Sequence, residues 1–252
     1  MDISFWQITL ITTTGFISGI INTLAGGGSN LTLPALMVLG MPPEVANATN
    51  RVGVLLQSMV GVFGFKRHDR LPTHDIVPIL LLVLPGGLIG AIIAAYSPST
   101  LLKPLLLGTM VVMAAIILIR PNIICPPPNT PPNPVGNNRS AWFWLFLSGL
   151  YGGFVQAGVG FMLITALAGS LRYDLVRTNA LKLVCTSGFT VVALVIFIAN
   201  DQVLWMPGLI LAVGAMGGAH FAVKFAIKAN PDTLKWLLFI MTLCASTAAL
   251  LF

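Results

Sequence analysis

The stretch NTLAGGGSNLTLPALMVLG, residues 22–40, interrupts a strongly hydrophobic chain with three consecutive glycines, a serine and an asparagine. Glycine weakens a helix by roughly 1 kcal/mol relative to alanine, so three in a row predict a break in the helical backbone. Non-helical backbone at membrane depth survives only where it is buried in protein or lines a wet cavity. The stretch therefore predicts a break that serves a function.

The composition around this stretch is that of a membrane protein. The 252 residues are 56% hydrophobic and 8% charged, whereas soluble domains carry about 25% charged residues. Residues 76–96 carry no charge over a length that can cross a bilayer. The apolar beginning of the chain lacks the basic region and cleavage site of a signal peptide, so we interpret it as part of the mature protein. Scattered cysteines predict neither a metal site nor a disulfide framework.

The chain contains two copies of one unit. Similar stretches recur in the same order: 15–28 with 149–162, 45–53 with 176–184, 86–94 with 214–222, and 97–102 with 230–235. These matches pair Arg51 with Lys182 and Asn22 with Gln156. We therefore expect a first transmembrane repeat at 1–120, a Pro/Asn-rich linker at 121–140 and a second repeat at 141–252, together forming one membrane domain.

The loop charges predict how the halves face. Each half has a glycine-interrupted segment followed by full spans: 5–40, then 44–65, 76–96 and 102–119; and 141–170, then 176–199, 203–223 and 233–252. If each interrupted segment crosses the membrane an even number of times, almost every loop cation faces the cytoplasm, as the positive-inside rule prefers. We expect an all-α polytopic membrane protein of two inverted repeats. Each repeat is a glycine-broken re-entrant hairpin, or a pair of short helices, plus three transmembrane helices.

The broken segments are the candidate solute site, because interrupted helices in inverted repeats mark the binding sites of secondary transporters. Their free N–H groups attract anions. The expected solute contacts of these segments are Asn22, Gly26, Gly27, Gly28, Ser29, Asn30, Gln156, Gly158 and Gly160. In contrast, Gly86, Gly90, Gly214 and Gly218 lie within continuous apolar spans at four-residue spacing, which predicts close helix packing.

Arg51 and Lys182 lie inside predicted spans, where a cation costs at least a few kcal/mol and usually faces a cavity or a partner. One interpretation is a snorkelling or ion-paired structural cation. The other is a pair of cations presented to an anion from both repeats. The same turns of these spans supply hydrogen-bonding side chains at Asn47, Thr49, Asn50, Thr178 and Asn179.

The segment GFISGIINTLAGGGSNLTLPALMVLGMPPEVANATNRVG, residues 15–53, resembles the first-repeat signature of the TauE/SafE family, also called the sulfite exporter family. The matching features are a Gly-xxx-Gly start, the glycine triplet, a proline-leucine arm and an alanine-threonine pair. The second half departs from the pattern, since Gly158-Val159-Gly160 replaces the triplet and the second arm lacks its proline. The resemblance implies a membrane permease with an anion substrate, since the characterised members of the family are associated with export of sulfite or organosulfonates; the direction of transport stays open.

The leading hypothesis is a secondary transporter for a small anion in the cell (inner) membrane, with the lipid bilayer as its surroundings. A proton or ion gradient would drive it, since the chain has no nucleotide-binding motif. An anion channel and a non-transporting membrane assembly protein remain alternatives. No enzyme motif is present, and we expect no catalytic residue, cofactor or metal. The net charge of +6 fits loops facing anionic lipid rather than nucleic acid. The sequence leaves open whether copies of the chain form a homo-oligomer.

Overall fold

The computed structural model describes residues 4–98, 100–102, 104, 105, 108, 131–229 and 233. Every regular element in these ranges is helical. The elements are α1 (Phe5–Leu24), α2 (Ser29–Val38), α3 (Pro43–Arg67), η1 (Thr73–Asp75), α4 (Ile76–Tyr96), η3 (Val135–Asn137), α6 (Arg139–Phe154), α7 (Val159–Ile164), the π-helical segment η4 (Thr165–Ser170), α8 (Leu175–Ala199) and α9 (Trp205–Lys228). The expected spans 102–119 and 233–252 lie almost entirely outside the described residues, as does the first part of the linker.

The expected membrane-type helices are present where the structure describes them. Helices at Thr73–Tyr96, Leu175–Ala199 and Trp205–Lys228 are long and apolar enough to cross a bilayer. Helix α3 has 25 residues but is more polar, because it carries Asn47, Asn50 and Arg51. The all-helical architecture predicted from the apolar runs is therefore confirmed.

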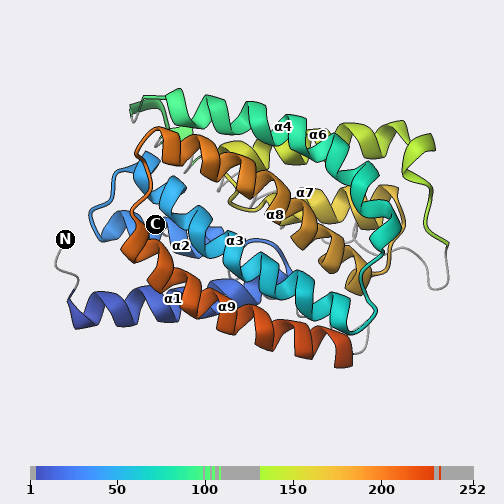
Figure 1. The fold of residues 1–252 in the computed structure, drawn as a ribbon, viewed down its shortest axis with the longest axis horizontal. Coiled ribbons are helices and arrows are strands. Elements are labelled where there is room, and N and C mark those ends of the chain that lie inside the picture. The colour runs from blue at the N-terminus through green and yellow to red at the C-terminus, as the bar shows by residue number, and fades with distance from the viewer. Residues whose placement is uncertain are drawn as a thin grey trace.

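Both glycine-interrupted segments are pairs of helices with a break between them. Helix α1 ends before Gly26, whose φ of +97° is left-handed, and α2 begins at Ser29. Helix α6 ends at Phe154, and α7 begins after Gly158, whose φ is +77°. In Figure 1, α1 begins at the left end of the bundle and α6 begins at the right end. Helix α2, with 10 residues, and the continuous helical stretch of α7 and η4, Val159–Ser170, are both too short to cross a bilayer alone.

Glycine backbone lets the helices of the two halves approach closely. Helix α1 packs along α9, α4 packs along α6, and α3 packs against both α8 and α9. A β-carbon on Gly214 or Gly218 would collide with carbonyl oxygens of α1, and one on Gly86 or Gly90 would collide with carbonyl oxygens of α6. The predicted packing role of these glycines is confirmed, and it is the mechanism by which membrane helices gain close contact.

Positive charge gathers at one end of the bundle. The end of α3, the start of α6, the start of α8 and the end of α9 all lie at the right in Figure 1. Described cations at these termini and their loops are Lys66, Arg67, Arg70, Arg139, Arg172, Arg177, Lys224 and Lys228. Among the described residues, the opposite end carries Glu44 at the start of α3 and Asp201 after α8. This asymmetry is the pattern that sets membrane orientation.

Substitution at Gly218 tests the packing. We expect Gly218→Ala to lower the free energy of unfolding by about 1–3 kcal/mol, because its β-carbon would overlap the Phe16 carbonyl. Gly217→Ala, on the exposed side of the same helix, is the matched control, since its β-carbon would lie 3.4 Å from the Phe16 ring. Melting temperatures of the purified protein in detergent measure both effects. Equal melting temperatures for the two variants would contradict this account of the α1–α9 contact.

Candidate functional site

The two helix breaks touch each other at the centre of the protein. The Gly160 N–H donates to the Gly26 carbonyl at 3.3 Å. A β-carbon on either glycine would collide with the other glycine's backbone. Glycine is required here both for this approach and for the left-handed φ of Gly26. The segments predicted to share one solute site are thus in direct contact.

Arg51 of α3 binds the C-terminal end of the broken helix α6 from the other half. Its Nη1 donates to the Gly152 carbonyl, and its Nη2 donates to the carbonyls of Gly153 at 2.8 Å and Phe154 at 3.3 Å. The side chain is 0% exposed, and its Cζ lies 5.5 Å from the ring centroid of Phe197. The guanidinium therefore caps carbonyls that a helix end leaves without partners.

Asn47 strengthens the same cap from one turn earlier on α3. Its Nδ2 donates to the Phe154 carbonyl at 2.9 Å, and its Oδ1 accepts from Arg51 Nη2 at 3.5 Å. Asn47 is 1% exposed. Two predicted site residues of the first half therefore act together on the break of the second half.

Lys182 of α8 makes the reciprocal contact. Its Nζ donates to the Thr23 carbonyl at the end of α1, at 3.0 Å, and to Asn179 Oδ1 at 2.8 Å. The side chain is 1% exposed. A cation at a helix C-terminus interacts favourably with the helix dipole, by about 0.3–1 kcal/mol at exposed sites and up to ~2 kcal/mol in partly buried ones. Each half therefore places a buried cation on the end of the other half's broken helix.

Neither buried cation is neutralised by a described carboxylate. The salt bridges of the described residues join His74 to Asp75 and Arg177 to Asp174, and neither Arg51 nor Lys182 takes part. Carbonyl oxygens solvate the two side chains but leave their charge uncompensated. Burial of charge without a counter-ion is costly.

A polar network joins α2 to α3 in the first half. Asn50 Nδ2 donates to Ser29 Oγ at 3.1 Å, and Thr32 Oγ1 donates to Asn50 Oδ1 at 2.6 Å. Asn30, on the first turn of α2, is 2% exposed, yet its Oδ1 and Nδ2 have no hydrogen-bond partner among the described residues. Buried amides are normally hydrogen-bonded, so Asn30 is an exception within this network.

Gln156 occupies the corresponding break of the second half. It is 2% exposed, with a left-handed φ of +67°. Its Nε2 donates to Thr190 Oγ1 at 3.1 Å, while its Oε1 has no partner among the described residues. Nitrogen and oxygen of an amide are assigned from such contacts, so rotation of this group would exchange the unpaired oxygen for N–H donors.

Free backbone donors accompany these side chains. Among the described residues, no acceptor is present for the N–H groups of Gly27 and Gly28 in the first break, nor for those of Ala157 and Gly158 in the second. Helix N-termini with such donors attract anions. Described residues form no cluster of three or more His, Cys, Asp or Glu that could hold a metal.

Two predicted site residues are engaged elsewhere. Thr49 Oγ1 accepts from the Leu204 N–H at 3.0 Å and so anchors the start of α9. Thr178 Oγ1 donates to the Tyr173 carbonyl at 3.2 Å, at the start of α8. Asn22, at 7% exposed, is buried beside the first break.

Thr32 and Thr190 hydrogen-bond to the predicted site residues Asn50 and Gln156, and the sequence interpretation did not include them. Both could be found from helical spacing, since Thr32 lies one turn after Ser29 and Thr190 two turns after Lys182. The sequence interpretation did not include Thr23 either. Its carbonyl accepts a hydrogen bond from Lys182, while its buried Oγ1 has no partner among the described residues.

Alanine at the glycine contact tests whether the two breaks depend on each other. Gly26→Ala and Gly160→Ala should each lower the free energy of unfolding by about 1–3 kcal/mol through overpacking. The double variant should cost less than the sum, because either substitution alone already separates the breaks. Thermal unfolding of the four proteins in detergent gives the coupling energy. Additive effects would show that the breaks are independent, and Gly136→Ala, whose β-carbon meets nothing within 4 Å, is the control.

Comparison of the sequence with known proteins identifies its family. The sequence model of the family described as "Sulfite exporter TauE/SafE" matches residues 11–249. A probable membrane transporter protein, ORF9, of Sinorhizobium sp is 24% identical over 248 residues, which cover 96% of this chain and 92% of the relative. A probable membrane transporter protein of Haemophilus influenzae is 24% identical, with 96% and 94% covered. The probable membrane transporter protein YfcA of Escherichia coli K12 is 23% identical, with 93% and 86% covered.

The family match covers almost the whole chain, and it includes both helix breaks and both buried cations. The chain belongs to the TauE/SafE family of membrane transporters.

Proposed function

We propose that the protein is a secondary transporter for a small anion, sulfite or an organosulfonate, driven by a proton or ion gradient. It is built from two inverted repeats, 1–120 and 141–252, joined by the linker 121–140. The reciprocal contacts support this division, since α1 packs on α9 as α6 packs on α4. The opposite starting ends of α1 and α6 support the inversion (Figure 1). No chemical conversion of the solute is part of the proposal.

The observation that carries the proposal is the pair of uncompensated buried cations at touching helix breaks. The described carboxylates, Glu44, Asp69, Asp75, Asp174 and Asp201, lie at helix ends or in loops. An anion bound between the halves would supply the missing counter-charge to Arg51 and Lys182. Coulomb attraction is strong in such a dry interior, so charge is the first criterion by which the site would select its solute.

The side chains and backbone donors around the breaks would hold the anion. The proposed contacts are Asn22, Gly26, Gly27, Gly28, Ser29, Asn30, Asn47, Asn50, Arg51, Gln156, Gly158, Gly160, Asn179 and Lys182. Thr49 and Thr178 would act less directly, through the start of α9 and the start of α8. Oxyanions suit this set, because amide N–H, hydroxyl and cationic donors all match anionic oxygens.

The basic end of the bundle would face the cytoplasm of an inner cell membrane. The positive-inside rule supports this orientation. The cytoplasmic leaflet is anionic, and it attracts cationic segments close to its surface. A homo-oligomer within the bilayer is compatible with this arrangement.

Flux through reconstituted protein tests the function. Wild-type proteoliposomes should move radiolabelled sulfite or a sulfonate, faster with a pH gradient than without one. Arg51→Ala and Lys182→Ala should lower the flux at least roughly tenfold, since each removes a charge worth well over 1.4 kcal/mol to a buried anion. Arg67→Ala is the matched control, because Arg67 is an exposed cation at the end of the same helix as Arg51.

Failure of wild-type protein to move any of these anions would overturn the proposed solute class. Unchanged flux in both interior variants would overturn the assigned site. The amount of each variant in the membrane fraction must match the wild type, so that lost flux is not lost protein.

The kinetics separate a transporter from a channel. A transporter should show flux that saturates with sulfite concentration, and external unlabelled sulfite should accelerate release of internal label. Both follow from a site that alternates between the two sides. The contact between Gly26 and Gly160 supports this mechanism, because it leaves the two breaks closed on each other. Flux that rises linearly without exchange would favour an anion channel instead.

A further inference from the structure

A cavity of about 510 Å³ opens at the basic end of the bundle, between the two halves. It is lined by the α3–α4 loop, by the linker around Asn133, and by Tyr173 and Arg177 at the start of α8. This volume falls within the ~300–1,000 Å³ range of small-molecule sites. The cavity has room for a small hydrated solute. Its lining carries charge of both signs, including Asp69 and Arg70, so it does not favour a solute of one charge.

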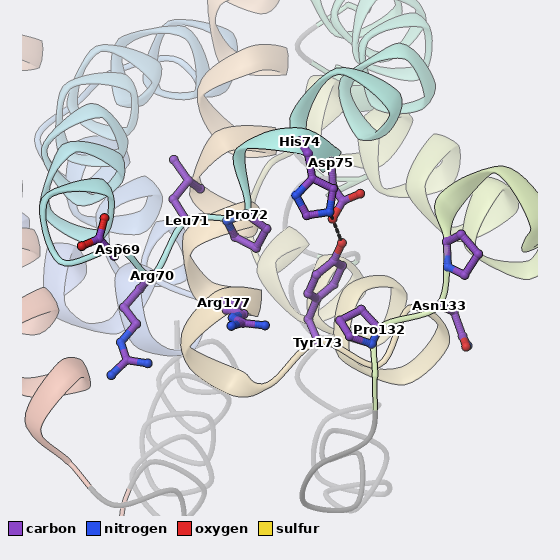
Figure 2. Close-up of a pocket in the computed structure, with 11 residues that line it drawn as sticks. Asp69, Arg70, Leu71, Pro72, His74, Asp75, Pro132, Asn133, Tyr173 and Arg177 are labelled. Atoms are coloured by element: carbon purple, nitrogen blue, oxygen red, sulfur yellow. Dashed lines mark hydrogen bonds and ion pairs between the residues drawn. The ribbon is translucent and has the colours of Figure 1, made fainter.

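One hydrogen bond joins the halves across this cavity. The Tyr173 hydroxyl donates to Asp75 Oδ2, and Figure 2 shows the two side chains meeting end to end. His74 Nε2 lies 2.9 Å from the same oxygen. Asp75 precedes α4 in the first half, whereas Tyr173 precedes α8 in the second half. Any separation of the halves at this end must therefore break the bond.

Tyr173 both lines the cavity and belongs to the buried core. It is 2% exposed and belongs to a buried cluster with Leu171, Leu181 and Cys185. Burial, together with the hydrogen bond to Asp75, raises the pKa of the Tyr173 hydroxyl above its ordinary value, so the phenol remains a donor. A hydroxyl that donates to a carboxylate forms a bond of the strong, charge-assisted kind.

The same residue is connected to the buried cations. The Tyr173 carbonyl accepts from Thr178 Oγ1, and Thr178 lies one turn before Lys182 on α8. Movement of Tyr173 would therefore displace the turn of α8 from which Lys182 binds the end of α1. The linker is attached nearby, because Asn133 Nδ2 and Asn138 Nδ2 both donate to the Ser170 carbonyl at the end of η4.

We propose that this cavity is the solute's vestibule on the basic side, and that the Tyr173–Asp75 hydrogen bond is the gate at its inner wall. The proposal rests on the transport function above and adds the route to its site. In the described arrangement the gate is closed, with the cavity on one side and the dry cluster around Cys185 on the other. Selection of the anion is left to Arg51 and Lys182, deeper in the protein.

Cys185 offers a reporter that needs no knowledge of the solute. It is 0% exposed and lies one turn after Lys182 on α8. The test uses full-length protein carrying Cys125→Ser and Cys244→Ser, so that Cys185 is the remaining thiol. A membrane-impermeant maleimide is applied separately to right-side-out and inverted membrane vesicles. The wild-type gate should make labelling slow from both sides.

Tyr173→Phe should speed labelling of Cys185 roughly tenfold from the side that bears the basic loops, the change expected for loss of one charge-assisted hydrogen bond. Asp75→Asn should act in the same direction and serves as the second variant if Tyr173→Phe folds poorly. Tyr151→Phe is the matched control, because the Tyr151 hydroxyl donates to the Ala157 carbonyl within the second half, at 2.6 Å. It should leave labelling of Cys185 slow.

Unchanged labelling in both gate variants, or faster labelling from the opposite side, would overturn the gate. The labelling experiment contains no solute, so its result does not depend on whether the protein transports sulfite. Absence of anion flux in the wild type would therefore refute the proposed function and leave the gate to be judged by Cys185 alone.

Discussion

The constraint on which the structure depends is that a helix broken inside a bilayer exposes carbonyl oxygens that no lipid can satisfy. The protein meets it with cations that each half supplies to the other. Arg51 covers the end of α6, and Lys182 covers the end of α1. Both side chains are buried and lack a described carboxylate partner. The same contact therefore stabilises the breaks and leaves positive charge at the centre, which is the condition that a site for an anion requires.

Close packing of helix backbones explains how the broken helices of the two halves can meet. Glycines on α1 and α9, and on α4 and α6, remove the side chains that would hold these helices apart. The pairs bring the two breaks together until Gly26 and Gly160 touch. A polar network then fixes each break to a helix of its own half, through Asn50 in the first and Thr190 in the second.

Much of this could be predicted from residues alone, because the signals are local or repeated. Three glycines in a row predicted the first break, and apolar runs predicted α4, α8 and α9. The internal match paired Arg51 with Lys182, and the structure brings both to helix breaks. The roles of Thr49 and Thr178 were beyond this reasoning, because their partners, Leu204 and Tyr173, depend on how distant helix ends meet. The anion-binding role of the whole set stays a proposal.

The sequence by itself determined the class of protein, the helical spans within the described residues and the place of the breaks, since hydrophobic length and glycine content act through local backbone energetics. Only the tertiary structure decided which partners the buried cations take. It also decided that the two breaks touch and that Tyr173 meets Asp75. These are contacts between residues roughly a hundred or more positions apart, and no short-range pattern encodes the geometry in which helices from two halves cross.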